Sequence, residues 1–193
     1  MTAYQADDGT IVATSARTAW RRRAVLVGGG FQVAFGALWI ARGLASLAPL
    51  TVAVGVGSVA LVAGLAAAVL LRRLAPRPSG VAARAIERRL TAATILQLVA
   101  SCALPITISG LAGSRLVLPS IVITIGILLV WIHHEVDTPY QGIAGWLLIG
   151  LAILSVLVGG STQTAVVGLS AAAVLLSCAG GGLSWLRHGR ELA

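Results

Sequence analysis

The stretch that decides the fold runs from residue 116 to residue 158 and reads LVLPSIVITIGILLVWIHHEVDTPYQGIAGWLLIGLAILSVLV. Two apolar runs, at about 116–134 and 142–158, flank a short polar segment that carries the only acidic residues of the stretch. An α-helix needs about 20 apolar residues to cross the hydrocarbon core of a bilayer. The stretch therefore predicts two membrane-spanning helices joined by a polar turn.

The rest of the chain repeats this pattern. Hydrophobic residues make up 58% of the 193 residues and charged residues 10%, whereas a soluble domain has about 25% charged residues. Arginine, proline and glycine interrupt the apolar runs and mark the turns. We therefore predict an all-α polytopic membrane protein, a compact bundle of six transmembrane helices. The expected spans lie at about 24–41, 50–71, 92–112, 116–134, 142–158 and 164–186. Apolar residues at helical spacing after Ser79 predict a helical segment ahead of the third span, either a cytoplasmic extension of that span or an interfacial amphipathic helix.

The segments outside the spans are short. We expect residues 1–19 to form a flexible cytoplasmic tail, residues 20–187 to form the transmembrane domain, and residues 188–193 to form a second cytoplasmic tail. The first apolar run follows a basic flank, as the apolar core of a signal peptide does. Because another apolar span follows at once, we interpret this run as an uncleaved first helix.

The basic residues indicate the orientation of the bundle. All 14 are arginines, and they stand at the ends of the apolar runs. With the N-terminus inside, twelve of them fall in cytoplasmic segments and only Arg42 and Arg115 fall in outer turns. The positive-inside rule then predicts a multi-pass inner-membrane protein with both termini cytoplasmic. We expect no nucleic-acid partner, since the position of the arginines at the span ends is explained by membrane topology.

Arginine without lysine, together with abundant Ala, Gly, Val and Leu, is typical of a high-GC bacterial gene.

The polar segment within the opening stretch holds the candidate catalytic residues His133, His134, Glu135 and Asp137. If the helix continues, Asp137 lies three and four positions after the two histidines and shares a face with them. A histidine and a carboxylate so placed can relay protons or act as acid and base. The alternative is a solvated helix end that faces the lipid headgroups. Metal binding would need more ligands from elsewhere in the chain, and the cluster is not a His-Glu-x-x-His motif, so we expect no metal. We also expect no cofactor.

A few uncharged polar residues stand inside the predicted spans. Gln32, Gln97, Ser101 and Thr124 are expected to face the bundle interior, because a polar group in lipid must find a partner. They either join helices by hydrogen bonds or line a ligand cavity. The predicted bilayer centre contains no charged residue, which argues against an ion-coupled pump or a voltage sensor.

Glycines are frequent in the first, second and last spans, at 28–30, 36, 55, 57, 64 and 180–182. Small residues let helix backbones approach closely in lipid, so we expect a tightly packed bundle. The alternative is that the glycine triplets are unwound points beside a binding cavity, as in transporters with broken helices.

Two regions carry a resemblance to known membrane proteins. Residues 116–152 have a proline early in one span, His133 and His134 at its end, and the sequence Gly-Ile-Ala-Gly-Trp at 142–146. This region resembles small six-span bacterial membrane proteins that have no assigned activity. The glycine-paced pair of first spans loosely resembles the six-span acid-resistance membrane protein family. Both resemblances imply a six-helix plan and neither implies a particular activity.

Three classes of function follow from these patterns. We expect a non-enzymatic bundle that works by association with membrane lipids, with a second copy of itself or with a membrane-protein partner. One alternative is a small transporter or channel for a neutral or apolar solute, lined by Gln32 and Gln97. The other is a membrane-embedded enzyme, an isomerase or a terpene-cyclase-like protein, that uses the cluster at 133–137 on a lipid-like substrate. The direction in which Glu135 and Asp137 point distinguishes an enzyme from a topology signal.

Overall fold

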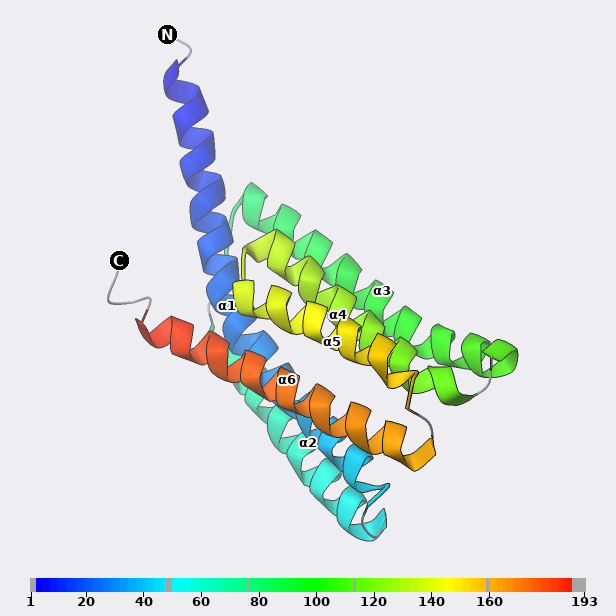
Figure 1. Ribbon diagram of the computed structural model, residues 1–193. Coiled ribbons are helices and arrows are strands. Elements are labelled where there is room, and N and C mark those ends of the chain that lie inside the picture. Colours follow the sequence, from blue (N-terminus) through cyan, green and yellow to red (C-terminus); the bar gives the residue numbers. More distant parts are fainter. Residues whose placement is uncertain (1–2, 48–49, 76, 113, 159, 189–193) are drawn as a thin grey trace.

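The computed structural model describes residues 3–47, 50–75, 77–112, 114–158 and 160–188 (Figure 1). All regular secondary structure in these ranges is helical, which confirms the all-α class. The helices are α1 (Ala3–Leu44), α2 (Leu50–Leu74), α3 (Val81–Ala112), the 3₁₀ helix η1 (Ser114–Leu116), α4 (Val117–Val136), α5 (Pro139–Ser155) and α6 (Gly160–His188).

The composition of these helices suits a lipid environment. Three described segments are long and apolar enough to cross a membrane, namely Arg17–Leu44, Val117–Val136 and Gly160–Leu186, and the apolar α5 is shorter. Large apolar side chains cover the outside of the bundle, for example Val59, Ile106 and Leu157, which are 72%, 74% and 80% exposed. Soluble monomers rarely expose apolar patches of more than a few hundred Å². The apolar helices and this surface are consistent with a membrane protein.

The helices pack in two groups of three. The first group has α1 at its centre, between α2 and α6, and the second has α4 at its centre, between α3 and α5 (Figure 1). The most extensive contact between the groups is that of α5 with α6, and α1 also packs on α3 and α4. Helix α3, the last of the first half of the chain, packs on α4, the first of the second half, and α6, the last of the second half, packs on α1. Neither half forms a group by itself.

Glycines bring the backbones of neighbouring helices into contact. A Cβ atom built on Gly64 of α2 would lie 2.5 Å from the Cβ of Ala34 on α1. A Cβ on Gly126 of α4 would lie 2.7 Å from the carbonyl oxygen of Gly145 on α5. Between α1 and α6, a Cβ on Gly168 would lie 2.6 Å from the backbone nitrogen of Gly43. Because any side chain at these positions would meet the facing helix, the glycines determine how closely the helices pack.

Two helices begin well before the predicted spans. Residues 3–19, which the apolar pattern assigns to a flexible tail, form the first part of α1, and Figure 1 shows this part extending beyond the other helices. Helix α3 begins at Val81, ahead of the span predicted from 92. It follows Gly80, whose φ of +105° is a conformation that favours glycine. Residues 189–193 of the expected second tail lie outside the described residues.

Candidate functional site

The turn between α4 and α5 positions the polar segment that the sequence singles out. Helix α4 ends at Val136, and Asp137 follows with φ 54° and ψ 62°, a left-handed conformation that aspartate tolerates better than most residues. The backbone N–H of Asp137 donates to the carbonyl oxygen of His133 at 2.7 Å. Pro139 then begins α5, because its fixed φ suits the first position of a helix.

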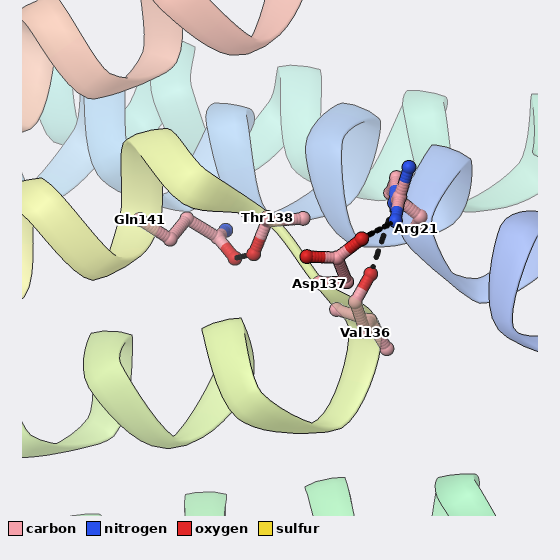
Figure 2. Close-up of polar contacts among 5 residues, drawn as sticks. All are labelled: Arg21, Val136, Asp137, Thr138 and Gln141. Atoms are coloured by element: carbon pink, nitrogen blue, oxygen red, sulfur yellow. Dashed lines mark hydrogen bonds and ion pairs between the residues drawn. The ribbon is translucent and has the colours of Figure 1, made fainter.

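An arginine of α1 holds this turn. The Nε of Arg21 donates to the carbonyl oxygen of Val136 at 3.1 Å, and its Nη2 pairs with the carboxylate of Asp137 (Figure 2). The guanidinium carbon also lies 5.4 Å from the ring centroid of Trp185 on α6, within the range of a cation–π contact. We call these four residues the Arg21 clasp. The clasp connects α1 to the α4–α5 turn and to the end of α6.

Three further contacts join the helices at the same end. Trp20 Nε1 donates to the carbonyl oxygen of Ala83 at 3.0 Å, and Arg23 Nη1 donates to that of Ala75 at 2.5 Å. Arg89 of α3 pairs with Glu135 of α4 at 3.5 Å. The two carboxylates of the predicted cluster therefore pair with arginines of different helices, Glu135 with Arg89 of α3 and Asp137 with Arg21 of α1.

The histidines of the cluster do not pair with the carboxylates. The ring of His133 packs against α5, where a Cβ on Gly142 would lie 2.7 Å from His133 Cδ2, and its Nδ1 is buried without a partner. His134 is exposed on α4, and its ring centroid lies 5.4 Å from that of His133. The spacing argument assumed that the helix continues to Asp137. Because α4 ends at Val136, Asp137 leaves the helical face and the predicted pair is not assembled.

The predicted cavity-lining residues separate into two places. Gln97 Nε2 of α3 donates to Thr124 Oγ1 of α4 at 3.1 Å, so these two side chains join neighbouring helices. Gln32 is buried in α1, at 6% exposure. Ser101 lies on α3, and its side chain is outside the described residues. No group of three or more described His, Cys, Asp or Glu side chains is placed to hold a metal ion.

Two buried polar residues at the start of α5 did not emerge from the sequence. Thr138 and Gln141 are 0% and 1% exposed, and Thr138 Oγ1 donates to Gln141 Oε1 at 2.5 Å (Figure 2). Their Thr-x-x-Gln spacing before an apolar run is the capping-box pattern, which would have marked this helix start. Arg21 gave no comparable signal, because its partners lie more than 100 positions away in the sequence.

We predict that Arg21→Ala destabilises the protein more than Asp137→Asn. The arginine variant loses the bond to the Val136 carbonyl, the ion pair and the Trp185 contact, and we expect a loss of about 1–2 kcal/mol. The asparagine variant loses only an ion pair whose carboxylate side is 62% exposed, so less than about 1 kcal/mol is expected. Thermal unfolding in detergent measures both. Equal effects would contradict the role assigned to the Val136 and Trp185 contacts.

Comparison with known protein families, curated proteins and solved structures found no match for this chain.

The interactions at this end of the bundle are mainly electrostatic. Arginine side chains neutralise two carboxylates and bind the last carbonyl group of α4, where a helix dipole favours positive charge.

Proposed function

We propose that this chain is a six-span, non-enzymatic protein of the cell inner membrane that works by associating with anionic lipid. The observation that carries the proposal is a set of exposed arginines at one end of the bundle, which we call the arginine end. They are Arg22, Arg72, Arg73, Arg84 and Arg88. Among the described residues, the ion pairs involve Arg21, Arg77 and Arg89 instead, so these five positive charges have no carboxylate partner there.

Contacts between turns support a common end for these charges. The bonds from Trp20 and Arg23 place the arginines of α1 beside the α2–α3 turn, and the Arg21 clasp adds the α4–α5 turn. At the other end, Arg115 Nη2 donates to the carbonyl oxygen of Val156, and Gln163 Nε2 donates to that of Arg115. Turns that alternate between two ends are what a six-span topology requires, and the positive-inside rule assigns the arginine end to the cytoplasm.

The charge of this end favours lipid as the partner over a second copy of the chain or another membrane protein. The cytoplasmic leaflet is negatively charged, and each arginine near it contributes about 1 kcal/mol of attraction. The carboxylates that an enzyme would need as proton donors are instead paired with arginines. This pairing favours a structural role for the cluster at 133–137.

We predict that phosphatidylglycerol raises the thermal unfolding temperature of the detergent-solubilised protein and that phosphatidylcholine does not, because only a lipid that binds the folded state stabilises it. The triple variant Arg72→Gln, Arg73→Gln, Arg88→Gln is expected to lose more than half of that shift. The control is Arg42→Gln, which removes an exposed arginine at the other end. The proposal is wrong if both lipids stabilise equally or if the triple variant keeps the full shift.

A further inference from the structure

Gln32 is a buried side chain whose hydrogen bonding is incomplete. It is 6% exposed, and its Nε2 has no hydrogen-bond partner. Its side chain lies within hydrogen-bonding reach of the thiol of Cys178 on α6, but a thiol sulfur is only a weak acceptor and does not replace an oxygen. The buried amide of Gln163 is used differently, since its Nε2 donates to the carbonyl oxygens of Arg115 and Ser155. A buried amide donor without an oxygen acceptor is unfavourable, so Gln32 is suited to bind an acceptor from outside the chain.

Open space lies beside this amide. Gly29 is three residues before Gln32 and therefore on the same face of α1. It is buried, yet a Cβ atom built on it would have no atom within 4 Å. The next glycine is different, because a Cβ on Gly30 would lie 2.8 Å from the Cα of Ala68. The space is therefore local to Gly29, and we call this pair the Gly29–Gln32 site.

The packing of α1 on α6 shows what faces this site. A Cβ on Gly182 of α6 would lie 3.0 Å from Val25 Cγ1, and a Cβ on Gly36 of α1 would lie 3.1 Å from Leu176 Cγ. The Gly29–Gln32 site lies between these two levels and so faces residues 176–182 of α6. This segment contains Cys178 and the glycine triplet at 180–182. Small residues on both helices leave room that larger side chains would fill.

The hydrogen-bond donors and the lack of charge at the site determine which ligands it can bind. Gln32 Nε2 offers N–H donors, which require an oxygen acceptor. Every described buried polar side chain is uncharged, so a buried ion would lack a counter-charge and would be strongly disfavoured. We propose that the Gly29–Gln32 site binds a small uncharged molecule through a carbonyl or hydroxyl oxygen. This binding goes beyond association with lipid, which uses the arginine end and not the interior of the bundle.

The test uses the full chain in lipid nanodiscs with ¹⁵N-labelled glutamine side chains. The probe is acetamide, and the control probe is acetate, which has nearly the same shape and a negative charge. We expect acetamide to shift the Gln32 side-chain amide signal saturably and acetate to leave it unchanged. Gln32→Leu assigns the signal, because it removes that resonance and leaves those of Gln97 and Gln141 in place.

A second pair of variants tests the open space. Gly29→Val is expected to abolish the acetamide shift, while unchanged signals from Gln97 and Gln141 show that the bundle is folded. Gly55→Val is the matched control, because Gly55 of α2 is exposed and its Cβ would also meet no atom within 4 Å. The proposal is overturned if acetamide gives no saturable shift, if acetate gives the same shift, or if Gly29→Val keeps it. The proposal is also overturned if water is the only molecule to which the Gln32 side-chain amide signal responds.

Discussion

Replacement of Gly145 by leucine is expected to prevent α4 and α5 from packing together. A Cβ at this position would lie 2.6 Å from the carbonyl oxygen of Gly126 and 2.9 Å from the backbone nitrogen of Val130. Both atoms belong to the backbone of α4, so no rotamer change relieves the clash. Overpacking of a core costs about 1–3 kcal/mol, and a backbone contact places Gly145→Leu at or above the upper value.

The measurement is thermal unfolding in detergent together with the yield of monodisperse protein. Gly150→Leu is the control, because Gly150 lies on the same helix and a Cβ there would meet no atom within 4 Å. We expect the control to behave like the wild type. Equal loss in both variants would mean that leucine itself, and not the α4–α5 contact, causes the effect.

Replacement of Gly64 by leucine is expected to detach α2 from α1. A Cβ on Gly64 would lie 2.6 Å from the Cα of Ala34 and 2.7 Å from its backbone nitrogen. Among the described residues, the extensive packing contacts of α2 are all with α1. Loss of this one interface therefore releases the whole helix, and we expect a destabilisation of about 3 kcal/mol or more.

Limited trypsin digestion in detergent detects the release of α2. The exposed arginines at the end of α2, Arg72 and Arg73, are trypsin sites, whereas Arg77 is not, because Pro78 follows it. Gly64→Leu is expected to be cut there several times faster than the wild type. Gly55→Leu, on the exposed side of the same helix, serves as the control. Similar cleavage rates in the two variants would show that the Gly64 contact does not hold α2.

The apolar pattern predicted helices well where composition changes sharply. The polar break at 133–141 corresponds to the α4–α5 turn, and the predicted last span lies within α6. The start of α1 was missed for a physical reason, whereas the helical spacing after Ser79 indicated the extension of the third span that α3 has. Hydropathy marks the part of a helix that suits lipid, whereas the helix itself continues until backbone hydrogen bonding ends. Ahead of α3, residues 75 and 77–80 are not helical, and Gly80 has a positive φ.

The candidate site was less predictable. Asp137 shares a helical face with the histidines only if α4 continues, and a left-handed residue at a helix end has no hydropathy signal. Arg21 was counted as one topology marker among twelve, because an ion pair across 116 positions produces no local pattern. The inward position of Gln97 and Thr124 followed from the cost of a polar group in lipid. Their pairing with each other required the packing of α3 on α4.

The six-span orientation is tested most directly by labelling single cysteines with a membrane-impermeant maleimide in right-side-out vesicles. The background is a variant without Cys102 and Cys178. The three exposed positions are Leu47 after α1, Ser79 before α3 and Ser161 at the start of α6. We predict that Leu47→Cys and Ser161→Cys react in intact vesicles and that Ser79→Cys reacts only after permeabilisation. Reaction of Ser79→Cys in intact vesicles, or protection of either outer position, would contradict the account.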